Sequence, residues 1–307
     1  MARKTTPRIG MRRLGAITAI GVIGAAGAGF AVAATPHQSG VGFTCEARLA
    51  TQVGTEAGET INGTTGDDVI VALGGNDTVN GLGGNDIVCL GAGDDSANGG
   101  TGIDRIFGED GDDNVNGAED ADHVDGGAGD DRLVGSAGDD VLLGADGNDR
   151  LDGGADSDVA DGGAGNDQVQ GGAGNDRRLK GGQGIDTVSG DAGRDNIYGG
   201  PGRDTLDGGA AIDTIWGQVG ADTINGGPAG DRIVGGPGND VMNGGSGADR
   251  LRGGEGNDRA FGDGGSDFLF GESGNDTLAG NAGSDFANGG LGTDSCSTAE
   301  ITKSCEN

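Results

Sequence analysis

Carboxylate side chains recur at one fixed spacing through most of this sequence. Aspartate occupies every ninth position from Asp68 to Asp176, and the spacing resumes from Asp186 to Asp294 after one inserted residue. Each of the two runs holds thirteen aspartates, which we call the ladder aspartates. Regular carboxylates beside glycine-rich segments, whose carbonyls are exposed, suit a hard cation such as Ca²⁺, which takes about six to eight oxygen ligands.

The other positions of the repeat keep the same period. An apolar residue stands two positions after most ladder aspartates, as in Val169, Leu206 and Ile233, and glycine nearly always stands four positions after them. The unit is therefore G-G-x-G-x-D-x-U-x, where U is apolar, and it is complete at residues 126–134, 162–170 and 235–243. An apolar residue at a fixed phase argues against a disordered glycine-rich linker, which does not need one.

Elementary geometry gives this unit a fold. The segment D-x-U-x alternates with period two, as in a short strand with U facing inward. The segment G-G-x-G-x is a turn whose glycines can adopt positive φ without steric cost. Two nine-residue units then close one coil, and the 26 units predict an all-β parallel roll of about 13 coils. Stacked at about 4.8 Å per coil, the roll would be roughly 60 Å long.

Composition agrees with such a thin core and excludes several functions. Glycine contributes 74 of 307 residues, but with 5 prolines and no three-residue period the chain is not collagen. Aromatic residues make up only 3% of the chain, which leaves little for a conventional core. The net charge of −31 argues against nucleic acid as a partner, because phosphate binding needs a basic face. Only 2 histidines are present as candidate catalytic bases.

The nonapeptide unit resembles the RTX, or haemolysin-type, calcium-binding repeat over residues 64–298. The resemblance implies a right-handed β-solenoid in which several Ca²⁺ ions lie between the turns of neighbouring coils, bound by Asp carboxylates and loop carbonyls. The predicted metal ligands are Asp77, Asp86, Asp95, Asp104, Asp113, Asp131, Asp140, Asp149, Asp167, Asp176, Asp186, Asp195, Asp204, Asp222, Asp240, Asp249, Asp258, Asp267, Asp276 and Asp285.

Some turns are expected to bind weakly or not at all. The glycine two residues before the ladder aspartate is replaced at Asp120, Asp156, Ala211 and Ala229, so weak sites are predicted at the aspartates that follow them, Asp122, Asp158, Asp213 and Asp231. The first unit, around Asp68, also lacks its glycine pair. Without metal, stacked carboxylates repel by about 3.5 kcal/mol per pair at an effective dielectric of 20. We therefore expect the metal-free chain to be largely unfolded or molten.

The first 33 residues have the features of a secretory signal peptide. Five basic residues precede an uncharged apolar run from Leu14 to Val32, which ends in the small-residue pattern Ala31-Val32-Ala33. A mature chain beginning at Ala34 is predicted, secreted to the extracellular space or cell surface, with no membrane insertion. An uncleaved anchor is the alternative, since the run is nearly long enough to span a bilayer.

The remaining organisation consists of two caps and one irregularity. Residues 34–63 are predicted as an N-terminal cap with a degenerate repeat, 64–298 as the roll, and 299–307 as a C-terminal cap. Cys296 stands at an inward position, and Cys305 follows one repeat unit later in the same phase, which predicts a disulfide; Cys45 would pair with Cys89. The extra residue near 177–181 marks either a joint between two halves, with a basic patch, or a β-bulge.

Outward strand positions offer candidate ligand-binding groups. Tyr198 and Trp216 are two repeat units, or one coil, apart and should stack on one face, as should Phe268 and Phe286. Such pairs could bind a glycan or a protein, although cross-strand ladders commonly only stabilise a sheet. Ice binding would need regular outward Thr-x-Asn ranks, but the sequence shows only the two at 78–80 and 223–225, which argues against it.

Taken together, the sequence predicts a secreted, non-enzymatic, calcium-binding roll with a structural or adhesive role. A glycan- or ice-binding solenoid is the second hypothesis. The third is a polysaccharide-modifying enzyme, which would need a catalytic constellation outside the repeat phase, and none is visible. Calcium, with a cell-surface glycan or protein, is the expected set of partners.

Overall fold

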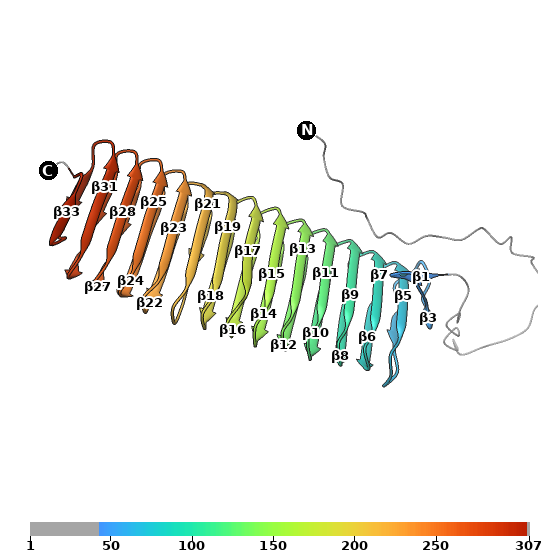
Figure 1. Cartoon of the computed structure of the whole chain (residues 1–307). Coiled ribbons are helices and arrows are strands. Elements are labelled where there is room, and N and C mark those ends of the chain that lie inside the picture. The colour runs from blue at the N-terminus through green and yellow to red at the C-terminus, as the bar shows by residue number, and fades with distance from the viewer. Residues whose placement is uncertain (1–42, 306–307) are drawn as a thin grey trace, which may run out of the picture.

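The computed structural model describes residues 43–305, and these form one parallel β-solenoid of about 14 turns without a helix (Figure 1). The all-β roll expected from the nine-residue period is confirmed, with about one turn more than predicted. The predicted signal peptide, residues 1–33, lies outside the described residues. No helix long and apolar enough to cross a membrane occurs between residues 43 and 305.

Two long parallel sheets form the walls, and a small antiparallel pair lies at the N-terminal end. Sheet 1 has 15 strands. They are β3 (Gln52–Val53), β5 (Val69–Gly74), β7 (Ile87–Ala92), β9 (Arg105–Asp110), β11 (His123–Ala128), β13 (Val141–Asp146), β15 (Val159–Ala164), β17 (Arg178–Gln183), β19 (Asn196–Gly202), β21 (Thr214–Gly220), β23 (Arg232–Pro237), β25 (Arg250–Glu255), β28 (Phe268–Ser273), β31 (Phe286–Leu291) and β33 (Ile301–Lys303).

Sheet 2 has 16 strands. They are β4 (Thr60–Asn62), β6 (Thr78–Gly83), β8 (Ser96–Thr101), β10 (Asn114–Glu119), β12 (Arg132–Ala137), β14 (Arg150–Ala155), β16 (Gln168–Ala173), β18 (Thr187–Ala192), β20 (Thr205–Asp207), β22 (Thr223–Pro228), β24 (Val241–Gly247), β26 (Arg259–Phe261), β27 (Gly264–Gly265), β29 (Thr277–Ala279), β30 (Ala282–Gly283) and β32 (Ser295–Ser297). The antiparallel pair joins β1 (Thr44–Cys45) to β2 (Arg48–Leu49).

Successive strands alternate between the two sheets through most of the roll, so strand neighbours within one sheet are two repeat units apart. Leu133 on β12 lies beside Leu151 on β14, and both are fully buried. The inward residues of both sheets form one continuous apolar cluster along the roll. This core is only one layer of side chains from each wall, which explains how the chain folds with so few aromatic residues.

The inserted residue near 177–181 does not interrupt either sheet. Val159 pairs with Arg178 at a separation of one residue more than usual, and β17 then pairs normally with β19. Arg177 contacts Asp139, while Arg178 and Lys180 contact Asp161. These contacts to acidic side chains of preceding turns offset the basic patch, and the continuous pairing favours a bulge over a joint.

Tyr198 and Trp216 stack on the outer face of sheet 1 as their spacing of one coil predicts, whereas Phe268 and Phe286 meet at a tilt of 38° and do not stack. The rings of Tyr198 and Trp216 are parallel within 5°, with centroids 4.5 Å apart. Phe286 contacts both Phe268 and Phe270, at 6.2 and 5.7 Å between centroids. Because Tyr198 and Trp216 lie flat against each other, they add a cross-strand contact that stabilises the sheet.

Disulfides close the two ends of the roll, and both predicted pairs are confirmed. Cys45 is joined to Cys89, and Cys296 is joined to Cys305. The expectation that Cys305 occupies the inward position of the next strand is wrong, because Thr302 stands beside Ala287 in the register and Cys305 follows the end of β33. The last turn is shortened, because Ile301 lies beside Phe286. If the last coil had two full repeat units, Ser304 would lie there instead.

Candidate metal sites on the two aspartate ladders

Every ladder aspartate is buried at the point where a turn enters a strand. The 26 side chains are between 0% and 6% exposed, although aspartate almost always lies at the surface. The turns that enter sheet 1 form edge 1 of the roll, and the turns that enter sheet 2 form edge 2. Thus the two candidate rows of metal ligands lie on opposite edges, and each row is continuous from coil to coil.

Edge 2 carries twelve of the predicted ligands, and edge 1 carries eight. On edge 2 these are Asp77, Asp95, Asp113, Asp131, Asp149, Asp167, Asp186, Asp204, Asp222, Asp240, Asp258 and Asp276. On edge 1 they are Asp86, Asp104, Asp140, Asp176, Asp195, Asp249, Asp267 and Asp285.

One carboxylate oxygen of each ladder aspartate has a structural partner. The backbone N–H of Asp113 donates to Oδ1 of Asp131 at 2.8 Å, and the N–H of Asp131 donates to Oδ1 of Asp149 at 2.9 Å. The same bond recurs across the inserted residue, where the N–H of Asp167 donates to Oδ1 of Asp186 at 2.9 Å. Oδ1 therefore ties each coil to the coil before it.

The second oxygen, Oδ2, is buried without a hydrogen-bond partner in 25 of the 26 ladder aspartates, from Asp77 to Asp294. The exception is Asp68, whose Oδ2 accepts from the backbone N–H and the hydroxyl of Thr64 at 2.7 and 2.9 Å. Leaving a buried polar group unpaired costs about 1–3 kcal/mol, and more when the group is charged. A row of such oxygens calls for a bound cation or a proton at each position, so the residues fit the cation that the repeat implies.

Burial makes these carboxyls bind protons more readily when no cation is present. It raises the pKa of Asp113 and of Asp131 from 3.8 to about 7, and that of Asp77 to about 6. The backbone hydrogen bond to each carboxylate acts in the opposite direction, and the neighbouring ladder aspartates raise the pKa of Asp113 and Asp131 further. Protons and a cation would therefore compete for the same oxygens near neutral pH.

Close packing against the carboxylate explains the glycine that stands five residues before most ladder aspartates, although Ala72 and Leu90 hold this position before Asp77 and Asp95. A Cβ on Gly99 would lie 2.3 Å from Oδ2 of Asp104 and 2.6 Å from the carbonyl oxygen of Gly117. A Cβ on Gly144 would likewise lie 2.3 Å from Oδ2 of Asp149 and 2.5 Å from the carbonyl oxygen of Gly162. Each missing Cβ thus leaves space that a carboxylate oxygen and a carbonyl oxygen of neighbouring coils share.

Side chains alone do not complete a metal site. Among residues 43–305, no three His, Cys, Asp or Glu side chains converge as a metal-binding group. A cation on either edge would therefore need backbone carbonyls in addition to Oδ2. Hard cations such as Ca²⁺ accept such carbonyl ligands readily, whereas zinc sites use nitrogen and sulfur ligands and some carboxylates.

The two edges differ in the glycine that stands two residues before the ladder aspartate. On edge 2 this position is glycine in all thirteen turns, and Gly129, Gly147 and Gly165 adopt φ of 138°, 150° and 143°. The four replaced positions all lie on edge 1: Asp120, Asp156, Ala211 and Ala229, with φ of 76°, 79°, 91° and 106°. The predicted weak turns therefore fall on one edge and leave the other uninterrupted.

This difference between the two edges is already visible in the sequence, although we did not predict it. Once the inserted residue is counted, the replaced positions are separated by even numbers of repeat units, that is by whole coils, which places them on one edge. The aspartates after these turns, and Asp294, still have an unpaired buried Oδ2 like the predicted ligands. What differs at the four positions is the turn residue itself, which is not glycine and still adopts a positive φ of 76° to 106°.

Comparison with known families places these turns among known repeats. A model of the RTX calcium-binding nonapeptide repeat matches residues 53–88, 91–124, 125–160, 143–177, 178–206, 198–229, 225–260 and 261–296. The chain belongs to this family. The matches cover nearly the whole described roll, and the repeats of the RTX family bind calcium. No curated protein is significantly similar to the chain.

Proposed function

We propose that this RTX chain is exported and folds outside the cell around Ca²⁺ ions bound on both edges, to serve as a structural or adhesive roll. The observation that carries the metal-dependent part is the unpaired, buried Oδ2 at 25 consecutive ladder positions. No fold would keep so many buried carboxylates ionised without positive charge beside them. The net charge of −31 also favours bound cations, because they reduce the repulsion between the acidic side chains.

Calcium then acts as part of the structure. At a free concentration ten times the dissociation constant of a site, each bound ion adds about 1.4 kcal/mol to the stability of the folded chain. Many such sites together offset the entropy of ordering a chain that is rich in glycine. The extracellular space suits this arrangement, because weak EF-hand sites with dissociation constants of about 0.1–1 mM are typical of extracellular modules.

Export is supported by two features. The first is the pattern of residues 1–33, with basic residues, an apolar run and a small-residue cleavage motif. The second is the pairing of all four cysteines in disulfides, which persist in oxidising compartments. Mass spectrometry of the protein from a culture medium tests this, because a mature N-terminus at Ala34 is expected and an intact Met1 in the cell pellet would contradict it.

Calcium-dependent folding is tested by far-UV circular dichroism of residues 34–307 during a Ca²⁺ titration from chelator to 10 mM, with Mg²⁺ as the control. A cooperative coil-to-β transition is expected with Ca²⁺ alone, because Mg²⁺ keeps its water and demands a stricter geometry. A chain that is already β-folded in chelator at pH 8 would show that the apolar core, the glycine turns and the disulfides suffice.

A further inference from the structure

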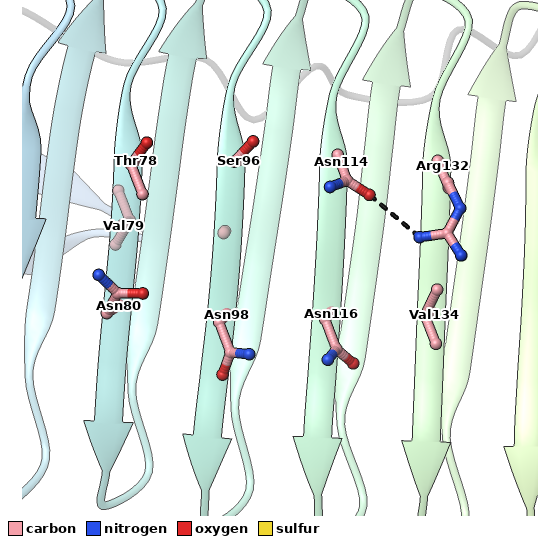
Figure 2. A pocket seen from close by; sticks show the side chains of 10 residues that line it. Thr78, Val79, Asn80, Ser96, Asn98, Asn114, Asn116, Arg132 and Val134 are labelled. Carbon is pink, nitrogen blue, oxygen red and sulfur yellow. Dashed lines mark hydrogen bonds between the residues drawn. The ribbon is translucent and has the colours of Figure 1, made fainter.

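A hollow of about 420 Å³ lies on the outer face of sheet 2 near the N-terminal end of the roll. It crosses β6, β8, β10 and β12, and its volume is in the range of small-ligand sites. Figure 2 shows two parallel rows of side chains over these strands. One row holds Thr78, Ser96, Asn114 and Arg132, and the other holds Asn80, Asn98, Asn116 and Val134.

The rows follow from the strand register. Asn80 pairs with Asn98, and Asn98 pairs with Asn116, so equivalent side chains recur once per coil. The register also adds Thr60 and Asn62 on β4, a Thr-x-Asn rank beyond the two found at 78–80 and 223–225. Between the rows, Val79 and Ala97 form the floor of the hollow. The result is a straight track of amides and hydroxyls with a repeat of about 4.8 Å.

The track is uncharged in a strongly acidic molecule. All outward side chains of β4, β6, β8 and β10 at these two positions are Thr, Ser or Asn, and Arg132 is the first charged residue along the rows. A charged ligand would find no opposite charge on these outward positions of β4, β6, β8 and β10, which hold only Thr, Ser and Asn. The surface therefore fits a neutral, polar ligand.

Much of the hydrogen-bonding capacity of the track is free. Asn80 donates to Oδ1 of Asn62 at 2.9 Å, and Arg132 donates to Oδ1 of Asn114 at 3.2 Å. The hydroxyl of Ser136 donates to Oδ1 of Asn116 at 2.8 Å, which leaves the amide NH₂ of Asn116 free. Within residues 43–305, the amide of Asn98 and the hydroxyls of Thr78 and Ser96 make no hydrogen bond, so their donors and acceptors face the hollow unpaired.

We propose that this track binds an extended, uncharged polysaccharide, whose hydroxyls would pair with the two rows of amides and hydroxyls. A straight chain of sugar rings presents donors and acceptors at a repeat close to that of the coils, whereas a coiled glucan would leave the track after a few rings. The proposal rests on the proposed function, because it needs the calcium-loaded roll outside the cell. The polysaccharide would be the ligand through which the roll adheres.

Saturation-transfer NMR with titration tests the proposal on the full mature chain in 10 mM Ca²⁺. Cellohexaose, an extended neutral glucan, is the probe, and maltohexaose, the curved isomer, is the linkage control. We expect cellohexaose to bind and maltohexaose to bind at least about tenfold more weakly. Asn98→Ala and Asn116→Ala should each weaken cellohexaose binding by about fivefold to tenfold, the loss expected for one side-chain hydrogen bond.

Asn225→Ala is the matched control, because Asn225 has the same repeat position on sheet 2 but its amide donates to Oδ1 of Asp207 at 3.0 Å. It should leave cellohexaose binding within about twofold. Absence of cellohexaose binding, equal binding of both glucans, or equal loss in all three variants would each overturn the proposal. Thermal hysteresis of ice growth without glucan binding would assign the track to ice and also overturn it.

Failure of this proposal and failure of the proposed function give different results. If the calcium-induced transition in circular dichroism is present and cellohexaose does not bind, only the glycan site is refuted. If the transition itself is absent, the metal-dependent fold is refuted first. The substituted side chains point outward, so the calcium midpoint of Asn98→Ala, Asn116→Ala and Asn225→Ala should equal that of the parent chain.

Discussion

Acid should replace calcium in folding this roll. Burial raises the pKa of Asp113 on edge 2 from 3.8 to about 7, and it raises the pKa of Asp122 and Asp195 on edge 1 to about 7 as well. A group whose pKa is higher in the folded state than in the unfolded state binds protons preferentially in the folded state. Its contribution to stability is therefore complete at low pH and is lost as the pH rises through the folded-state value of about 6 to 7.

The magnitude is large even for one site. A pKa increase from 3.8 to about 7 corresponds to roughly 4 kcal/mol of difference between the protonated and ionised forms of Asp113 in the fold. Coupling between neighbours and access of water reduce this value. Repeated at the 23 ladder aspartates from Asp77 to Asp276, all of whose pKa values are raised, a small fraction of it per site still exceeds the typical stability of a domain, about 5–15 kcal/mol.

The assay is far-UV circular dichroism of the chelator-treated chain between pH 4.5 and 8.5. We expect β-structure at the acid end and its loss between about pH 5 and 7.5, with calcium restoring it at pH 8. The calcium concentration at the midpoint of folding should also rise as the pH falls within the folded range, because protons compete for Oδ2. A chelated chain that is equally folded at pH 5 and pH 8, or more folded at pH 8, would refute the reasoning.

Three further predictions concern the turns, the core and the ends. Gly129→Ala should sharply raise the calcium concentration at the midpoint of folding, because Gly129 has a φ of 138° and a Cβ there would lie 2.0 Å from the carbonyl oxygen of Gly111. Ala229→Gly on edge 1 should instead lower this midpoint. A calcium titration of both variants tests this, and equal midpoints would contradict the difference between the edges. Leu133→Ala should cost about 2–5 kcal/mol in thermal or urea unfolding with calcium present, because Leu133 is fully buried, while the half-buried Val134→Ala should cost clearly less. The double substitution Cys45→Ser and Cys89→Ser should lower the free energy of unfolding by about 4 kcal/mol, because that disulfide closes a loop of 44 residues. The double substitution Cys296→Ser and Cys305→Ser should lower it by under about 3 kcal/mol, because that loop has 9 residues. The reverse order in urea unfolding would show that the chain-entropy argument fails here.

Local repetition explains why so much of the fold could be predicted. A nine-residue period sets where each turn and each inward residue falls, so Leu133, Leu151 and Val169 were expected in the core and are buried there. Coil length then fixes the neighbours across strands, so Tyr198 was expected beside Trp216. The calcium-binding family and the parallel roll followed from the same spacing.

Features that depend on contacts between coils needed the tertiary structure. The period marks each ladder aspartate but does not show that Oδ1 is taken by a backbone N–H while Oδ2 is left without a partner. It also misplaced Cys305, because the final turn is shortened and Glu300 takes the place of a ladder aspartate by accepting from the N–H of Asp285. Hydrogen bonding at the ends of the roll differs from that of its middle, and a period cannot describe it.

The sequence by itself determined the repeat, the inward and outward alternation and the chemistry of the carboxylates, because these depend on residues within one turn and one strand. Only the tertiary structure decided which of those groups remain unpaired and that the rows from Thr78 to Asn116 meet over a hollow. These properties arise from the stacking of residues one coil apart, where the register of two coils decides what each side chain contacts.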